Sequence, residues 1–135
     1  MVPKTTIAPG VLLPLLSLGT GSGQHGNVTY AVQEWIALGG SAIDTAHDYK
    51  DQKAIARALK STPRSDVFLT TKITCAPADN VKSQIADNLS QLGVSAVDLL
   101  LIHMDKCLPG GDLASTWSAL EASYERRLRE AREQV

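Results

Sequence analysis

Apolar residues fall into two patterns that alternate along this chain. Short apolar and β-branched runs, typical of strands, occupy residues 5–7, 11–13, 15–18, 42–44, 67–72 and 96–103. Segments with apolar residues at every third or fourth position, typical of amphipathic helices, begin near Asn27, Ala54, Asp79 and Asp112. The first two runs flank Ala8-Pro9-Gly10, which predicts a hairpin. Four strand–helix pairs then follow, which predicts an α/β domain with a parallel sheet.

Some details of this pattern predict local structure. Asn27 and Asp79 precede periodic segments and are expected N-caps, because their side chains can accept from free backbone N–H groups. The run from Val97 to Ile102 is apolar except for Asp98, which predicts a strand that is buried on both faces. Periodicity alone allows either a doubly wound sheet or a barrel.

Composition narrows the class of protein. Of the 135 residues, 44% are hydrophobic and 20% charged, as in ordinary globular domains, and a net charge of −1 predicts no general attraction to nucleic acid or anionic membranes. No apolar run reaches the ~20 residues of a membrane helix. Val11–Leu18 resembles the core of a signal peptide, but Pro14 interrupts it, so we expect a cytoplasmic protein. Cys75 and Cys107 are too few for a disulfide scaffold and suit a reducing compartment.

Three predicted strands end in a polar or ionisable residue. These residues are Asp44, Lys72 and His103, and Tyr49 lies five positions beyond Asp44. The carboxyl ends of parallel strands share one edge of the sheet, where ligands bind. A lysine cation favours the ionised form of a nearby phenol, and a carboxylate keeps the lysine charged and oriented. An imidazole can donate a hydrogen bond to a carbonyl as charge develops on its oxygen. The four residues therefore form a candidate catalytic site.

Two other interpretations use some of the same residues. Gly21-Ser22-Gly23-Gln24-His25-Gly26 fits the dinucleotide-binding fingerprint, with Asp44 as the ribose-binding acid. That interpretation leaves Tyr49, Lys72 and His103 unexplained, so a loop over a cofactor is favoured. A zinc site could use His47, Cys75, His103 and Cys107. Their spacing is not the short pairing typical of structural zinc, so we expect no metal.

Three segments at consecutive strand ends resemble, in order and spacing, the signatures of the aldo-keto reductase family. They are Ile43-Asp44-Thr45-Ala46-His47-Asp48-Tyr49, Leu69-Thr70-Thr71-Lys72-Ile73 and Asp98-Leu99-Leu100-Leu101-Ile102-His103. Trp117-Ser118-Ala119-Leu120-Glu121 resembles the fourth-helix segment of that family. The resemblance covers about Thr5 to Arg129 and implies a (β/α)8 TIM-barrel type of fold, here its first four βα units behind a hairpin that closes the bottom of the barrel.

The resemblance also implies an activity, the NADPH-dependent reduction of aldehydes or ketones to alcohols. Tyr49 would be the general acid, Asp44 and Lys72 would tune it, and His103 would orient a small carbonyl substrate. The residues expected to contact the cofactor are Gly19, Thr20, Gly21, Asp44 and Lys72. The chain departs from the family at one point in this segment. Members of the family usually have Asn-Glu after the tyrosine, whereas this chain has Lys50-Asp51-Gln52.

The same resemblance stops before a fifth strand. Barrels of this type need ~250 residues, whereas residues 130–135 continue the fourth helix. We therefore expect one truncated domain over residues 1–135, with a hairpin (5–13), four βα units (15–129) and a divergent helical tail (130–135). Barrel-facing leucines would lose their opposite wall, at a cost on the order of 10 kcal/mol. These are Leu16, Leu18, Leu69, Leu99 and Leu101. Self-association, as in a homodimer through exposed sheet edges, and weak activity are expected. The alternative is an inactive half-barrel or interaction module.

Overall fold

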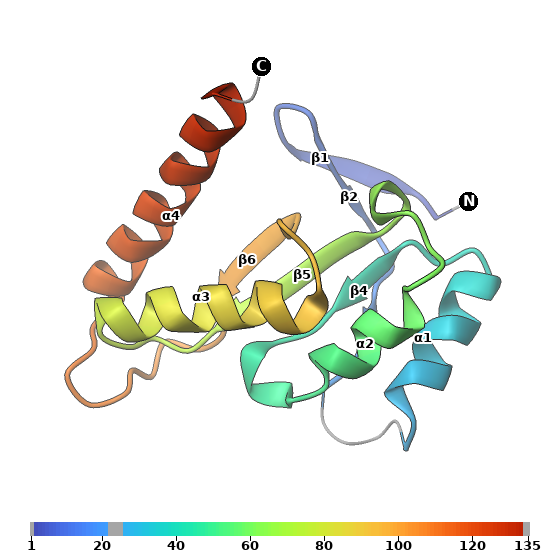
Figure 1. Cartoon of the computed structure of the whole chain (residues 1–135), viewed down its shortest axis with the longest axis horizontal. Helices are drawn as coiled ribbons and strands as arrows, with labels where there is room; N and C mark the ends of the chain where they lie inside the picture. The colour runs from blue at the N-terminus through green and yellow to red at the C-terminus, as the bar shows by residue number, and fades with distance from the viewer. Residues whose placement is uncertain (1, 22–25, 134–135) are drawn as a thin grey trace.

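The structure, a computed structural model, describes residues 2–21 and 26–133, with side chains as far as residue 127. Its strands are β1 (Lys4–Ala8), β2 (Val11–Pro14), β3 (Leu18–Gly19), β4 (Ala42–Asp44), β5 (Phe68–Ile73) and β6 (Leu99–Ile102). Its helices are α1 (Val28–Ala37), α2 (Gln52–Ala58), α3 (Ala78–Leu92) and α4 (Leu113–Glu133), with short 3-10 turns η1 (His47–Tyr49) and η2 (Arg64–Asp66). Figure 1 shows the sheet with α1, α2 and α3 packed along it.

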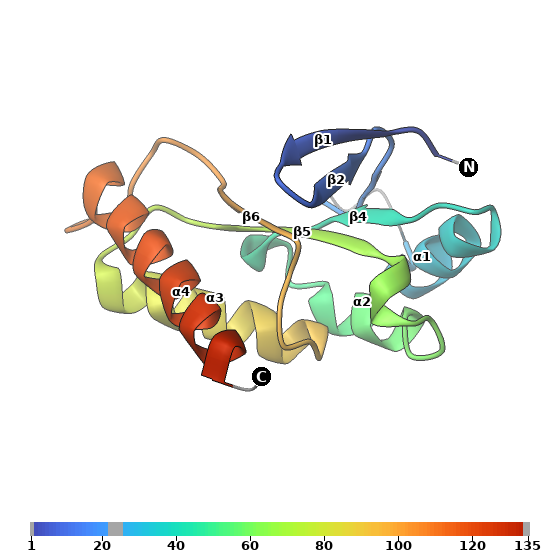
Figure 2. The same cartoon turned by 90° about the horizontal axis from the view of Figure 1, so that it is seen from above.

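The central sheet has the order β3-β4-β5-β6, and every neighbouring pair is parallel. The order in space is thus the order along the chain. Figure 2 shows the helices on one side of this sheet and the β1–β2 hairpin on the other. A doubly wound sheet reverses its strand order and carries helices on both faces. The arrangement is therefore that of consecutive βα units of a barrel, which decides the choice that periodicity left open.

The predicted hairpin lies at the amino ends of the parallel strands. β1 and β2 pair in antiparallel fashion, and Gly10 makes the turn with a φ of 77°, in the left-handed region that favours glycine. A cavity of about 270 Å³ separates the hairpin from the sheet. Its walls include Lys4 and Pro14 from the hairpin and Phe68 and Asp98 from the strand starts. The opposite edge of the sheet, at the carboxyl ends, is left uncovered by the hairpin.

The main core lies between the sheet and the helices. Ile43 and Leu69 are register partners on β4 and β5 and are fully buried against Val32 of α1 and Ile55 of α2. Side chains alternate along a strand, so Asp44 and Lys72 point to the other face. The prediction that Leu18 and Leu69 face the barrel interior was therefore wrong. Leu69 is 0% exposed, and Leu18 packs on the same core.

Other leucines are uncovered, as expected. Leu16 is 59% exposed and Leu101 is 37% exposed. The prediction that the last strand is buried on both faces was wrong, because β6 pairs only with β5 among the described strands and lies at an edge. Asp98, just before β6, accepts hydrogen bonds from Leu69 N (2.8 Å) and from the Arg64 guanidinium (2.6 Å). This carboxylate therefore ties the start of β6 to β5 and η2.

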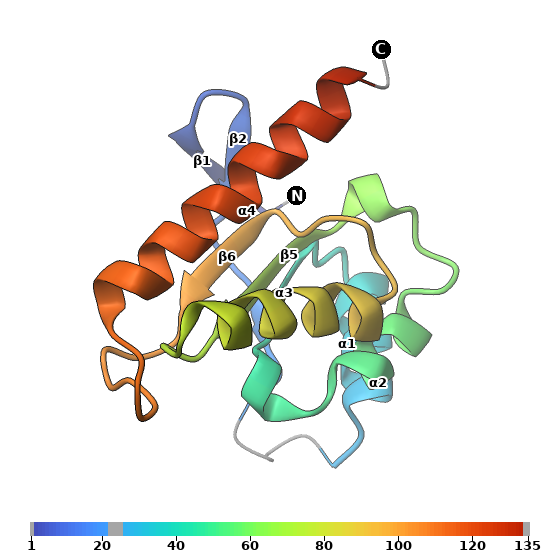
Figure 3. The ribbon, with the colours of Figure 1, turned by 60° about the vertical axis from the view of Figure 1, so that its left-hand side comes forward.

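The helix starts agree only in part with the sequence. Asn27 caps α1 as predicted, since its Oδ1 accepts from Tyr30 N at 3.1 Å. Asp112 does the same for α4, accepting from Ser115 N at 2.9 Å. Asp79 does not cap α3, because the helix already begins at Ala78 behind Pro77 and Asp79 lies in its first turn. Figure 3 shows α4 running past the β6 edge. Among the described helices, none combines the length and apolar character needed to cross a membrane.

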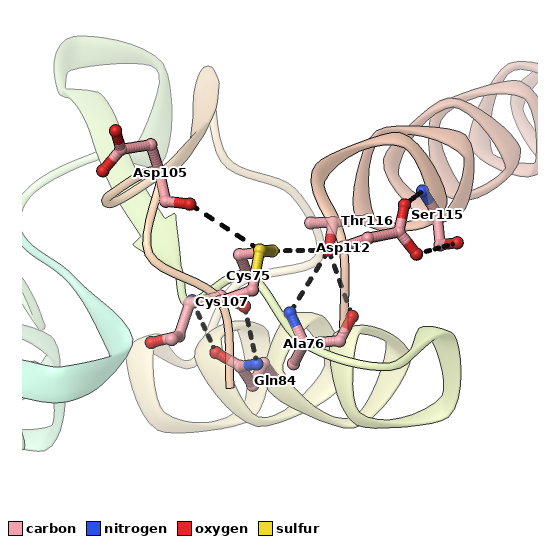
Figure 4. The surroundings of a disulfide bond; sticks show 9 residues. Cys75, Ala76, Gln84, Asp105, Cys107, Asp112, Ser115 and Thr116 are labelled. Carbon is pink, nitrogen blue, oxygen red and sulfur yellow. Dashed lines mark hydrogen bonds between the residues drawn. A yellow bond between two sulfur atoms is a disulfide. The ribbon is translucent and has the colours of Figure 1, made fainter. Parts of the chain in front are cut away.

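Cys75 and Cys107 form a disulfide, which corrects the expectation of two reduced thiols. Their Cα atoms are 4.5 Å apart, because the loops after β5 and β6 leave adjacent parallel strands. Figure 4 shows the surrounding bonds: Thr116 Oγ1 accepts from Ala76 N at 3.2 Å and lies 3.1 Å from Ala76 O. The cysteines thus no longer argue for a reducing compartment, since disulfides are rare there.

Candidate active site

The four predicted site residues come together at the carboxyl edge of the sheet. Asp44 ends β4, Lys72 lies near the end of β5, and His103 follows β6 with its N–H bonded to Ile73 O at 2.8 Å. Tyr49 comes from η1, which is closed by Lys50 in the left-handed region. Parallel pairing in sequential order brings the strand ends into one row, and the turn after β4 brings Tyr49 back over it.

Lys72 is the centre of this cluster. Its side chain is only 13% exposed and its ammonium group forms an ion pair with Asp44 Oδ1. The same Nζ donates to Thr45 O at 3.0 Å and lies 3.5 Å from Tyr49 OH. The lysine cation therefore has a carboxylate on one side and the phenol on the other. The contact between Lys72 and Asp44 meets the ~4 Å criterion for an ion pair.

His103 closes the cluster on the far side of the phenol. Its Nε2 lies 3.4 Å from Tyr49 OH, and the two rings meet edge to face with centroids 5.4 Å apart. The hydroxyl of Tyr49 thus has two nitrogen neighbours, one from β5 and one from the residue after β6. The Tyr49 hydroxyl could donate a hydrogen bond to a carbonyl oxygen placed beside it, and the neighbouring lysine cation and imidazole could stabilise negative charge that develops there.

The start of the glycine-rich loop lies against the same cluster. Gly19 is the register partner of Asp44, and Thr20 N donates to Asp44 O at 3.0 Å. At Gly21 an added Cβ would lie 2.5 Å from Cζ of Tyr49, so only glycine allows this close approach. Residues 22–25 of the proposed dinucleotide fingerprint lie outside the described residues. The Asp44 carboxylate, which that fingerprint would assign to a ribose, is paired with Lys72.

Two of the four candidate zinc ligands, Cys75 and Cys107, are joined in the disulfide, so they cannot bind a metal in this structure. Over the described parts of the chain, no three or more His, Cys, Asp or Glu side chains are arranged so that they could hold a metal ion.

One residue near the site was missed from the sequence. Asp48 lies between two histidines, with Oδ1 3.6 Å from His47 Nδ1 and Oδ2 3.7 Å from His103 Nδ1. Partial burial disfavours its charge, but a 2.7 Å hydrogen bond from Thr74 and the nearby His47 together lower the pKa of the Asp48 carboxyl. The adjacent His47 bonds to Asp87, at 2.9 Å. Only the tertiary contact between η1 and His103, the residue after β6, could have revealed Asp48.

Comparison with known proteins gives a consistent family. The family model described as the aldo/keto reductase family matches residues 16–126. An aldo-keto reductase of Mycobacterium leprae is 33% identical over 123 residues, which are 88% of this chain and 43% of that protein. Methylglyoxal reductase DkgA of Escherichia coli is 32% identical over 96 residues, which are 70% of this chain and 35% of that protein.

Solved structures agree in fold. An aldo-keto reductase of the silkworm, Bombyx mori, superposes with a TM-score of 0.85 at 26% identity, covering 95% of this chain and 46% of that one. A second silkworm aldo-keto reductase, solved in complex with NADP, has a TM-score of 0.83 at 27% identity, covering 94% of this chain and 48% of that one. This chain spans less than half the length of these relatives, and its parallel sheet corresponds to part of their TIM-barrel fold. The chain belongs to the aldo/keto reductase family.

Proposed function

We propose that this chain carries the proton-donating site of an NADPH-dependent reductase that converts small aldehydes or ketones to alcohols. The observation that carries the proposal is the environment of the Tyr49 hydroxyl, with Lys72 Nζ at 3.5 Å and His103 Nε2 at 3.4 Å. Family membership supports an oxidoreductase, and the NADP complex of the silkworm relative supports the cofactor.

Each residue has a distinct task in this proposal. Tyr49 donates its phenolic proton to the carbonyl oxygen of the substrate. Lys72 stabilises the phenolate that remains, because a cation lowers the cost of a neighbouring negative charge. Asp44 holds the ammonium in place through its ion pair. His103 orients the substrate next to Tyr49.

The residues at this edge fit the nicotinamide end of the cofactor, which would supply a hydride to the carbonyl carbon. Gly19, Thr20 and Gly21 would hold it beside Asp44 and Lys72. The glycine at position 21 brings the backbone of this loop against the Tyr49 ring, and so to the same edge as the four site residues. Holding both reactants in a reactive geometry supplies much of the rate in such reactions. For the 135 residues tested by themselves, which span under half of the relatives' length, we expect weak NADPH binding and slow turnover.

The test is a fluorescence titration with NADPH together with turnover of an aromatic aldehyde at high protein concentration. We expect slow oxidation of NADPH, which Tyr49→Phe lowers by ~10²–10⁴-fold, the usual contribution of a positioned acid. Tyr124→Phe is the matched control, because Tyr124 is 66% exposed on α4 and lines the groove between α3, α4 and β6. Turnover that survives Tyr49→Phe would overturn the proposal. Tight binding with fast, Tyr49-dependent turnover would overturn the expectation of weak activity.

A second candidate function is a non-catalytic interaction module. The observation in its favour is an apolar groove of about 720 Å³ between α3, α4 and β6, lined by Leu89, Leu100 and Trp117 among others. Trp117 is 56% exposed there, and β6 is an edge strand that another chain could pair with. A complete lack of NADPH binding in the titration would favour this candidate.

A further inference from the structure

The second nitrogen of the His103 ring, Nδ1, is buried and has no hydrogen-bond partner among the described residues. Buried polar atoms without a partner are uncommon and call for an explanation. The charged atom near this nitrogen is Oδ2 of Asp48, at 3.7 Å. That separation is an ionic contact, longer than a hydrogen bond.

A residue other than the histidine, Thr74, holds Asp48 in this position. Thr74 Oγ1 donates to the same Oδ2 at 2.7 Å, and Thr74 directly follows β5. Asp48 itself lies in η1, between the catalytic candidates Asp44 and Tyr49 in sequence. The carboxylate is thus fixed between the edge of β5 and the imidazole, although its side chain is 45% exposed to solvent.

The other ionisable groups around His103 are compatible with a charged Asp48. Tyr49 faces Nε2, and behind it Lys72 is paired with Asp44. On its other side Asp48 contacts His47. Burial opposes ionisation of Asp48, but the Thr74 hydrogen bond and the two imidazoles outweigh it, so that the pKa of the Asp48 carboxyl lies below its ordinary value. Asp48 therefore remains an anion near neutral pH.

We propose that Asp48 is a positioning residue that keeps the proton of the neutral His103 ring on Nδ1 and leaves Nε2 as an acceptor facing Tyr49 OH. A neutral imidazole carries its proton on one nitrogen, and the partner of one nitrogen decides the state of the other. An anion beside a buried Nδ1 stabilises an N–H dipole there and repels a lone pair. The Tyr49 hydroxyl would then donate to Nε2. This carboxylate–imidazole–hydroxyl order follows the physical logic of an oriented catalytic histidine.

The consequence for catalysis, which rests on the proposed function, is a change in the role of His103. A neutral ring with its proton on Nδ1 cannot donate from Nε2 to a substrate carbonyl. In that state only Tyr49 can donate, once its hydroxyl proton turns from Nε2 to the carbonyl oxygen. His103 gains a donor at Nε2 only when the ring is doubly protonated. Asp48 would thus make substrate orientation by His103 depend on pH.

The experiment measures the tautomer directly in the ¹⁵N-labelled full chain, without cofactor or substrate. Long-range ¹H–¹⁵N spectra at a pH where the imidazoles are neutral distinguish Nδ1–H from Nε2–H. The chain has three histidines, and loss of one signal set in His103→Gln assigns the ring. We expect wild-type His103 to be mainly Nδ1–H. Asp48→Asn should reduce that fraction, and Asp48→Ala should make Nε2–H the majority form.

Asp87→Asn is the matched control, since it removes a carboxylate from His47 and leaves the contact of Asp48 with His103 in place. It should alter the His47 signals and leave the His103 tautomer unchanged. A wild-type ring that is mainly Nε2–H would overturn the inference even if the Asp48 variants fail to fold, and so would equal tautomer ratios in wild type and Asp48→Ala. A chain without reductase activity would contradict the proposed function and leave this measurement unaffected.

Discussion

The disulfide between Cys75 and Cys107 makes the stability of this chain depend on the redox state. The perturbation is reduction of the bond by an excess of dithiothreitol. Noncovalent contacts hold the two loops together as well: Leu108 N donates to Cys75 O at 2.9 Å, and Thr116 bonds to Ala76. The reduced protein should therefore keep its fold, and the main effect of reduction should be a gain of freedom in the unfolded chain.

The magnitude follows from the length of the closed loop. The two cysteines are 32 residues apart, and closing a loop of this length stabilises a fold by about 3.7 kcal/mol in the chain-entropy treatment. Whole domains have only ~5–15 kcal/mol of stability. For a domain of this size, reduction should lower the Tm by roughly 10–15 °C.

The assay is thermal unfolding followed by circular dichroism, with and without dithiothreitol. A Cys75→Ala/Cys107→Ala double variant is the control, and its Tm should not respond to the reductant. Equal Tm values for oxidised and reduced wild type, with the redox states verified by mass spectrometry, would refute the reasoning. Two free thiols in folded protein purified without reductant would show that the bond does not form.

Three further expectations concern stability, pH and assembly. Gly40→Ala should lower the free energy of unfolding in urea by about 1–3 kcal/mol, because the added Cβ would overlap the Trp35 indole, which donates a 2.9 Å hydrogen bond to Ala42 O. Gly26→Ala is the control and should lower it much less, since no described atom lies within 4 Å of the added carbon. Equal losses of stability in the two variants would contradict the argument. The pKa of the Asp48 carboxyl is lower in the folded state than in the unfolded state, so this group stabilises the fold at a pH above its unfolded-state pKa. The contribution is lost as the pH falls through the pKa of the folded state. In urea unfolding across this pH range, the stability of Asp48→Asn should therefore fall less steeply in acid than that of the wild type. Light scattering over a concentration series should show self-association, because β6 and Trp117 are uncovered, and a monomer at all concentrations would argue against it.

Features set by local sequence were predictable. The strand at 42–44 and the Asn27 cap were predicted as they occur, because β-branched and apolar runs and short polar side chains act on their own backbone neighbours. The convergence of Asp44, Lys72 and His103 was also predictable. Parallel strands joined by helices share one edge for their carboxyl ends, so residues at those ends must lie near one another.

The tertiary structure decided the properties that depend on distant segments. Alternation places Leu69 on one face of β5 and Lys72 on the other, but which face the helices cover is a property of the whole sheet. Cys75 and Cys107 are 32 residues apart and meet only because β5 and β6 are neighbours. Likewise, Asp48 reaches His103 because η1 packs over β5. The sequence by itself thus determined the elements and the residues at the strand ends, whereas the contacts between loops, with their redox and protonation chemistry, arise only when the strands lie side by side.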